Sequence, residues 1–516
     1  MSDRHTTESI REELTHRDDQ SLSARITENP EPFLRWAVPM FALIAVEFAT
    51  WAGIAVGMVD ALVVGVTAAV ELTLNYVSPG LAQAVVDFQA GAVGMLRSVG
   101  GMLGEFPTLL SREVIPNQGH QTPDGSWQGT FLGLQPAVAW AIRFVLIIAY
   151  ALFTAYWSFR GWLVYRDHYR ESDWTPTDDV VNNLRGHRWG QFGVIVLIVF
   201  LTMATFGSAL APSTVSQNIE NTYGEESRIQ YLSDGGTVET AFAGDANFNS
   251  KSKGAVETNV GLMSYDDYGR FHPFGTMPNG RDLFTFMMGG ARITMIVSGM
   301  AITGAAVIAM TLSMLSAYYS GSVDLGVLTV ADGVVSIPQL LLLIMMSAVF
   351  ADTWLGSVLD GGFLLALIFA FTTWPFLWRA VRGPALQVAQ EDWVRAAESY
   401  GQQPQKIMRK HMLPYILGYL LVYASMSVGG IIISLSALSF LGNGLGISPP
   451  TPAWGRAISA GQSYVSTVSW HISLVPGLMI VLLVTGMNAL GDGIRDAIDP
   501  ETEADEGEEA AAGGGA

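Results

Sequence analysis

The sequence predicts an all-α membrane protein that crosses the bilayer several times, and three observations support this. Half of the 516 residues are hydrophobic and only 14% are charged, whereas a soluble domain carries about a quarter charged residues. The hydrophobic residues gather in runs of roughly 20 or more with few charges, the length that spans a bilayer core. Because backbone groups in lipid must be hydrogen-bonded within their own segment, these runs are expected to be helices.

The composition and the missing motifs exclude several classes of function. The 27 basic and 46 acidic residues give a net charge of −19, so the basic surface of a nucleic-acid-binding protein is absent. No cysteine occurs, which excludes disulfides and thiolate zinc sites. No glycine is followed by lysine, so the phosphate-binding P-loop motif cannot occur. We expect no nucleic-acid partner, no cofactor, no metal and no enzymatic activity in this chain.

The acid excess is accompanied by very few lysines. There are four, at Lys251, Lys253, Lys406 and Lys410. This combination resembles proteins of salt-loving archaea, in which a dense acidic surface keeps proteins hydrated. It also fits an ordinary acidic protein, and both interpretations stay open.

The N-terminal part is expected to form a polar cytoplasmic arm and then an extra membrane region. Residues 1–33 are charged and polar, and they lack the short apolar core of a cleavable signal peptide. Residues 34–188 contain two expected spans, near 34–58 and 136–158. The stretch 59–112 is apolar but interrupted by charges, so it fits either two poor spans or amphipathic surface helices.

Charges at bilayer depth are costly, so we favour a single span before an external loop at 113–135. After the span at 136–158, the loop 159–188 carries five arginines, Arg160, Arg166, Arg170, Arg185 and Arg188. The positive-inside rule places this loop in the cytoplasm.

The rest of the chain is expected to form a core of six spans, of which residues 189–211 are the first. Residues 212–285 are polar over most of their length and should form a small extracellular domain. Residues 286–499 hold five further spans, near 286–319, 323–350, 362–381, 415–440 and 473–492. Residues 500–516 are acidic and then rich in Ala and Gly, which predicts a disordered tail.

The loop 382–414 between two of these spans falls in the cytoplasm when the spans are counted, and its basic residues agree. A helix is expected from Glu391, because acids stand at its start and Gly401 supplies a left-handed stop. A second short helix should begin at Pro404 and end at Pro414. An ordinary helix-turn-helix link between two spans is the alternative interpretation of this loop.

The same stretch resembles the EAA loop of ABC-importer permeases, in which Glu-Ala-Ala is followed by a spaced Gly and then by an apolar-x-Leu-Pro. The matching residues are Ala396, Ala397, Gly401, Leu413 and Pro414. Arg395 stands where the family has Glu, and His411 stands where it has an apolar residue. Both departures resemble the dipeptide, oligopeptide and nickel branch, whose Tyr-Val-x-Ala-Ala corresponds here to Trp393-Val394-Arg395-Ala396-Ala397.

Four further stretches resemble the second permease of dipeptide and oligopeptide importers, so that the resemblance covers about 189–500 and leaves out 1–188. They are His272-Pro273-Phe274-Gly275-Thr276 with Gly280-Arg281-Asp282 and Gly290-Ala291-Arg292-Ile293, Trp374-Pro375 with Arg379, Val381 and Arg382, Leu438–Gly442 with Pro449–Gly455, and Pro476-Gly477 with Asn488–Asp496 and Asp499-Pro500.

Several of these residues are candidates for structural or gating roles, and each also has a plain structural interpretation. Gly280, Arg281 and Asp282 fit a turn before a helix start. Arg292 fits an anchor that snorkels to the membrane surface. Asp332 is an intramembrane acid and hence a functional candidate, although packing or capping explains it more simply. Trp454 fits an interfacial anchor, and Gly491-Asp492-Gly493 fits a helix end at the cytoplasmic face.

The resemblance implies a permease subunit of an ABC importer in the cell membrane, with the 391–414 loop and the C-terminus in the cytoplasm. It implies a second related permease, two ATPase subunits and an extracellular solute-binding protein as partners, and import of peptides or a similar solute by alternating access. A stand-alone secondary transporter or channel is the alternative, and it would need ionisable residues buried in several spans. A membrane enzyme or receptor is supported only by the external domain. No residue identifies the solute.

Overall fold

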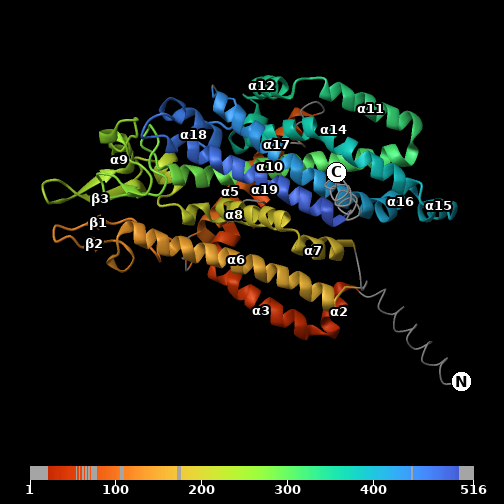
Figure 1. Cartoon of the computed structure of the whole chain (residues 1–516), viewed down its shortest axis with the longest axis horizontal. Helices are drawn as coiled ribbons and strands as arrows, with labels where there is room; N and C mark the ends of the chain where they lie inside the picture. The colour runs from red at the N-terminus through yellow and green to blue at the C-terminus, as the bar shows by residue number, and fades with distance from the viewer. Residues whose placement is uncertain are drawn as a thin grey trace, which may run out of the picture.

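The computed structural model describes residues 21–498 except 54, 57–58, 61–62, 64–66, 68–69, 71–77, 105–107, 109, 171–175, 352 and 443–444. In this part of the chain, long helices run side by side along the longest axis of the molecule (Figure 1). Six helical stretches there are long and apolar enough to cross a membrane. They are α6 (Pro136–His168), α8 (Arg188–Leu210), α10 (Leu283–Tyr319), η5 with α14 (Val358–Ala389), α16 through α17 (Pro404–Leu441) and α19 (His471–Ile498). They confirm the expected all-α membrane architecture.

The N-terminal helices begin earlier than the expected polar arm allows. Helix α2 (Leu22–Glu28) is capped by Ser21, and α3 (Pro30–Val46) has Pro30 in its first turn, where proline is favoured. Tyr169 at the end of α6 holds their junction, because its hydroxyl donates to Asn29 O at 2.6 Å. Residues 1–20 of the arm predicted at 1–33, and the whole tail predicted at 500–516, lie outside the described residues.

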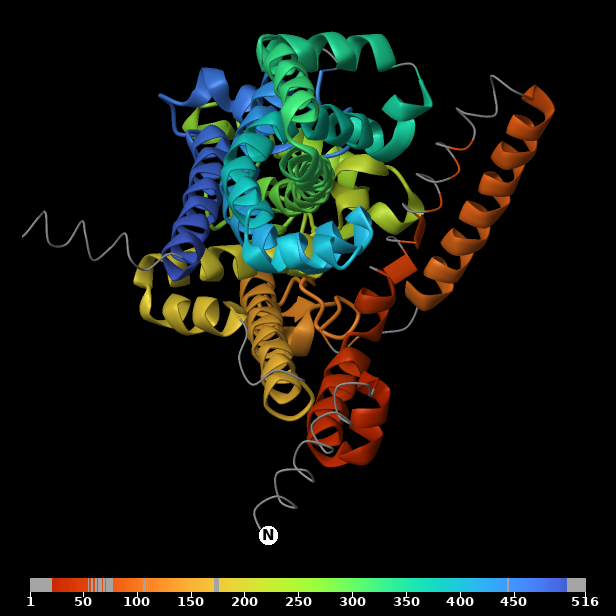
Figure 2. The ribbon, with the colours of Figure 1, turned by 90° about the vertical axis from the view of Figure 1, so that its right-hand side faces the viewer.

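Two helices of this N-terminal region are not among the candidate spans. Helix α3 has 17 residues, and the expected span at 34–58 is only partly described. Helix α5 (Pro79–Gly104) lies within the stretch whose status the sequence left open, and Figure 2 shows it standing apart from the main bundle. Helix α7 (Pro176–Gly186) links α6 to α8 and packs against α19.

The N-terminal region is hydrogen-bonded to the C-terminal end of α8, the first core helix. Arg112 and Arg143 each donate from Nη2 to Ala211 O at 2.9 Å, and Trp140 Nε1 donates to Leu210 O at 2.8 Å. The final carbonyls of α8 have no partners within the helix, and the negative end of the helix dipole favours cations. The arginines therefore fasten the N-terminal region to the core.

Helix α10 is the central helix of the core, and the other core helices surround it in the view of Figure 2. Small residues recur on it every four positions and are buried, at Ala301, Ala305, Ala309, Ser313 and Ala317. This spacing places them on one helix face. Small residues let a second helix approach closely, and α14 packs here with Trp374 and Trp378 in the same cluster.

Helices α8 and α19 cross at glycines. A Cβ atom on Gly193 would lie 2.4 Å from Leu490 N, and one on Gly493 would lie 2.6 Å from the Cα of Gly190. The expectation that Gly491-Asp492-Gly493 end a helix is wrong, because α19 continues to Ile498. Gly493 serves the crossing with α8 instead, since only a bare backbone fits there, whereas a Cβ atom on Gly491 would lie 2.6 Å from Met426 Cγ of α17.

The segment expected as one span at 323–350 consists of two helices. Helices α11 (Gly321–Val335) and α12 (Gln339–Phe350) are bent by 80° at the break between them. Pro338 precedes α12 directly, and proline has no N–H with which to continue the hydrogen bonds of α11.

Short strands and helices form the end of the molecule opposite α15 (Figure 1). Three antiparallel pairs occur there, β1 (His120–Gln121) with β2 (Trp127–Gln128), β3 (Arg228–Leu232) with β4 (Val238–Phe242), and β5 (Ser264–Tyr265) with β6 (Phe271–His272). The remaining short elements are η1 (Phe131–Gly133), η2 (Ser216–Glu220), η3 (Glu225–Ser227), α9 (Ala243–Asn249), η4 (Val256–Thr258), α13 (Trp354–Ser357), α18 (Trp454–Gly461) and η7 (Gln462–Tyr464).

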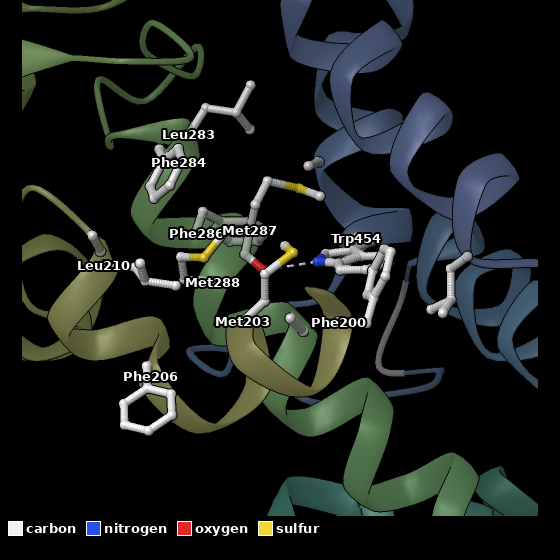
Figure 3. Close-up of a cluster of buried hydrophobic side chains, with 14 of the residues drawn as sticks. Phe200, Met203, Phe206, Leu210, Leu283, Phe284, Phe286, Met287, Met288 and Trp454 are labelled. Carbon is white, nitrogen blue, oxygen red and sulfur yellow. Dashed lines mark hydrogen bonds between the residues drawn. The ribbon is translucent and has the colours of Figure 1, made fainter. Parts of the chain in front are cut away.

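Trp454 lies inside the protein and is not an interfacial anchor. It is 1% exposed, and its Nε1 donates to Met287 O at 2.9 Å (Figure 3). Gly290 provides the space, since a Cβ atom there would lie 2.5 Å from Trp454 Cδ1. The sequence could not predict this burial, because the space for the indole lies on α10, more than 160 residues earlier in the chain.

Candidate functional site

Residues 391–414 lie at one end of the long helices, where α15 and α16 are labelled in Figure 1. Helix α15 (Asp392–Ser399) buries Val394 and Ala397, which pack with Ile407 in a small apolar cluster. Tyr318 of α10 and Val388 of α14 pack against this cluster. The inner face of α15 therefore rests directly on two core helices.

The outer face of α15 is open to solvent. Arg395 and Ala396 are exposed, Trp393 is 42% exposed and Tyr400 is 88% exposed. The Trp393 ring stacks on Tyr415 of α17 with ring centres 5.6 Å apart. An exposed apolar and aromatic surface of this kind is typical of a contact site for another protein.

Gly401 ends α15 in the left-handed conformation that the sequence predicted, with φ of +73°. Gly401 N donates to Glu398 O at 2.9 Å and Gln402 N donates to Ala397 O at 3.2 Å, which is the Schellman pattern at a helix end. A Cβ atom on Gly401 would meet no atom within 4 Å. The turn is therefore fixed by its own backbone, and the space beside it is free.

The second helix does not end at Pro414, contrary to the sequence expectation. Helix α16 (Pro404–Ile407) continues through a π-helical turn, η6 (Met408–Met412), into α17 (Leu413–Leu441). Pro414 sits at the start of α17, where its missing N–H is tolerated. His411 Nε2 lies 3.2 Å from Gln402 Oε1, so this turn also contacts the end of the first helix.

Asp332 forms an ion pair with Arg379, and Asp324 pairs with both Nε and Nη2 of Arg382. Each pair joins α11 to α14. Asp332 is more than half exposed, and its arginine partner lies on the neighbouring helix α14. Arg292 is exposed on α10.

The other predicted candidates lie at the opposite, strand-bearing end. Gly280 has φ of +77°, and a Cβ atom on it would overlap Asn247 O. Arg281 donates to Ile219 O at 3.2 Å. Asp282 caps α10, because its Oδ2 accepts from Thr285 N at 2.6 Å. The structure therefore confirms a turn before a helix start and separates these residues from 391–414.

A buried charged network surrounds the start of α10, and the sequence did not reveal it. His272 is 3% exposed, with Nδ1 2.8 Å from Asp282 Oδ1 and Nε2 3.3 Å from Asp266 Oδ2. Arg270 Nε donates to the same Asp266 oxygen at 2.7 Å. The motif at 272–276 marked this histidine, but nothing in the sequence indicated its acidic partners.

The network shifts the pKa values of two of its members. Burial by itself lowers the pKa of His272, but its hydrogen bonds and the charges of Asp266 and Asp282 raise it above its usual value. Burial by itself raises the pKa of Asp266, but the charge of Arg270 and the bond to His272 hold it well below its usual range. The start of α10 is thus held by an imidazole whose two ring nitrogens each face a carboxylate.

Comparison with known proteins gives a family match over residues 309–504, described as binding-protein-dependent transport system inner membrane component. This range contains the 391–414 segment and most of the core helices.

Relatives extend the similarity. The chain is 35% identical over 230 residues to the dipeptide transport system permease protein DppC of Alkalihalophilus pseudofirmus, which covers 45% of this chain and 72% of that protein. It is 33% identical over 252 residues to the glutathione transport system permease protein GsiD of Pectobacterium atrosepticum, covering 46% of this chain and 80% of that protein. GsiD of Escherichia coli O157:H7 is 35% identical over 230 residues, covering 45% and 72%.

Proposed function

This chain belongs to the family of binding-protein-dependent transport system inner membrane components, and from that membership we propose that it imports peptides or a similar small solute as an ABC permease. The permeases that it resembles are named for dipeptides and for glutathione. Both are small peptides, which supports a solute of this chemical class. The protein would act by alternating access in the cell membrane.

We propose that residues 391–414 couple this chain to its ATPases. The observation that carries the proposal is the two-sided character of α15. Its inner residues Val394 and Ala397 rest on α10 and α14, while its outer surface around Ala396 and Gly401 is free. A partner that binds the free face can push on the core through the buried one.

The roles within this segment follow from burial. Ala396 and Gly401 would let the ATPase backbone approach closely, because neither presents a bulky side chain. Trp393 and Tyr400 provide exposed aromatic contact, and Arg395 adds a charge at the surface. Val394, Ala397, Leu413, Pro414 and His411 hold the segment together and join it to α17.

The motion proposed for transport is a rigid-body tilt of the core helices. The contacts of Tyr318 and Val388 with the α15 cluster would transmit a displacement to α10 and α14. The ion pairs of Asp324 and Asp332 with α14 would carry α11 with it. At the other end, Gly280, Arg281, Asp282 and Trp454 would keep the external start of α10 in place.

The proposed partners are a second related permease, two ABC ATPase subunits and an extracellular solute-binding protein. The pathway would run between the two permeases, with the 391–414 segment, the C-terminus and the loop 159–188 in the cytoplasm. The separation of the 391–414 segment from the strand-bearing end supports this orientation (Figure 1). ATP hydrolysis belongs to the partner subunits.

The permease type and the source organism are proposed from the sequence alone. The motif order from 189 to 500 supports the second-permease type of a peptide importer. The net charge of −19 with four lysines supports a salt-loving archaeon as the source. The matched motifs leave 1–188 out, so this region would be an addition to the permease core.

The function is tested by purifying the chain with its partner subunits and measuring solute-stimulated ATP hydrolysis and uptake in proteoliposomes. Replacing Gly401 with Trp should abolish uptake while the protein still inserts, because the bulk would block the ATPase contact. Gly236→Trp is the matched control, since Gly236 also has a positive φ and free space but lies in the β3–β4 turn. Normal uptake by Gly401→Trp would overturn the coupling role.

A further inference from the structure

A cavity of about 540 Å³ lies in the strand-bearing part of the molecule, remote from the 391–414 segment. One wall comes from the loop leading into β1, and another from the β3–β4 hairpin, which lies beside β1. Cavities that hold small ligands have volumes of about 300–1,000 Å³. The extra N-terminal region and the external domain thus enclose a space of ligand size between them.

Basic side chains predominate around this cavity, although the whole protein is acidic. The charged and titratable side chains in its lining are His120, Arg228, Tyr268, Arg270, His272 and Asp282. His272 and Arg270 are already bound to Asp282 and Asp266. The arginine with spare capacity is Arg228, whose Nη2 binds Glu225 Oε1 at 2.8 Å, while no bond to its Nε or Nη1 occurs within the described residues.

One face of the β3–β4 hairpin adds neutral hydrogen-bonding groups next to Arg228. Gln230 is two residues further along β3, so its side chain lies on the same face. Thr240 pairs with Gln230 across the hairpin and also lines the cavity. A guanidinium is therefore followed by an amide and a hydroxyl along a single wall.

Asn117, which also lines the cavity, holds a polar atom without a partner among the described residues. Asn117 is 4% exposed and donates from Nδ2 to Pro212 O at 3.1 Å. Its Oδ1 is buried and accepts no hydrogen bond from any described residue. Buried polar atoms are nearly always paired, so this oxygen is suited to accept an N–H from a ligand.

We propose that this cavity binds a short peptide or a comparable small solute that combines a carboxylate with amide groups. Arg228 would hold the carboxylate, because guanidinium binds carboxylates through two parallel hydrogen bonds. Gln230, Thr240 and Asn117 would bind the amides. Binding of a solute in this cavity needs neither ATP nor the 391–414 segment. Only the claim that such binding is a step of uptake rests on the proposed function.

The test is calorimetric titration of the purified full chain in nanodiscs with trialanine and with trialanine amide, which lacks the carboxylate. Trialanine should bind saturably, and both Arg228→Gln and replacement by the amide should weaken binding at least about tenfold, the effect of losing a charged hydrogen bond. Gln230→Glu should weaken it also, because two carboxylates would repel.

Lys253→Gln is the matched control, since it removes an exposed cation of the same external part that does not line the cavity. It should bind trialanine as the unchanged protein does, and so should Gly401→Trp, which separates this site from ATPase coupling. The proposal is overturned if the unchanged chain shows no saturable binding, or if Arg228→Gln binds trialanine equally well.

Discussion

Nδ1 of His272 lies 2.8 Å from Oδ1 of Asp282, and the other oxygen of that carboxylate caps the central helix α10. A histidine in the strand-bearing part is thereby joined to the helix that contacts α8, α14 and α17. Asp266 lies at the other ring nitrogen, so this imidazole links two carboxylates beside the start of α10.

The first prediction concerns the pH dependence of this junction. The raised pKa of His272 stabilises the fold fully below its unfolded value of 6.5, and this contribution is lost as pH rises through the raised value. The lowered pKa of Asp266 acts oppositely, with stabilisation present above 3.8 and lost as pH falls through its folded value. The protection of 264–285 against hydrogen exchange, relative to the intrinsic exchange rate at each pH, should therefore be greatest between pH 3.8 and 6.5.

Replacing His272 with Gln tests the same junction. A buried charge pair that loses one partner costs about 3 kcal/mol, so local exchange should become much faster in the variant. The protection factor of the variant should also lose the dependence on pH that the unchanged protein shows above 6.5. An unchanged pH profile in His272→Gln would show that the imidazole does not hold the start of α10.

A second prediction concerns the glycine crossing of α8 and α19. Gly193→Ala should destabilise the protein by about 1–3 kcal/mol, because the added methyl group would overlap Leu490. Gly299→Ala in α10 is the matched control, since a Cβ atom there meets nothing within 4 Å. Thermal unfolding in detergent compares the two, and equal unfolding temperatures would contradict the close crossing.

A third prediction concerns the indole of Trp454. Trp454→Phe keeps an aromatic ring but removes the hydrogen bond to Met287 O, so it should cost about 1 kcal/mol. Trp470→Phe should cost almost nothing, because Trp470 is 39% exposed. Equal unfolding temperatures for these variants would argue against the buried position of Trp454.

The sequence predicted local features well and tertiary ones poorly. Gly401 was predicted to be left-handed because a helix end needs this conformation whatever packs around it. Pro414 was expected to end its helix, but a π-helical turn before it lets the helix continue. Trp454 and Gly493 were misassigned because their neighbours, Gly290 and Gly190, come from distant segments.

The difference between local and tertiary features also explains why the sequence did not reveal the network around His272. His272 and Asp282 are ten residues apart, and the turn around Gly280 brings them together. Periodicity carries no information on such a contact. The long apolar runs, in contrast, predict membrane helices without any tertiary contact. Six expected spans have counterparts among the candidate spans, namely those near 136–158, 189–211, 286–319, 362–381, 415–440 and 473–492.

A fourth prediction concerns orientation, and it exploits a chain without cysteine. Ala396→Cys should react with a membrane-impermeant maleimide in inverted vesicles but not in intact cells, because residues 391–414 are proposed to be cytoplasmic. Gly236→Cys, in the exposed turn between β3 and β4, should react in intact cells. The reverse labelling pattern would invert the proposed topology.

The coupling role of the 391–414 segment is tested most directly by photo-crosslinking. A benzophenone maleimide is attached to the Arg395→Cys variant, where an exposed long side chain already stands, and the same label on Gly236→Cys is the control. We predict a crosslink from position 395 to an ATPase subunit, with a yield that changes when ATP binds, and none from position 236. Absence of an ATPase crosslink at position 395, in a complex that still transports its solute, would contradict the coupling role.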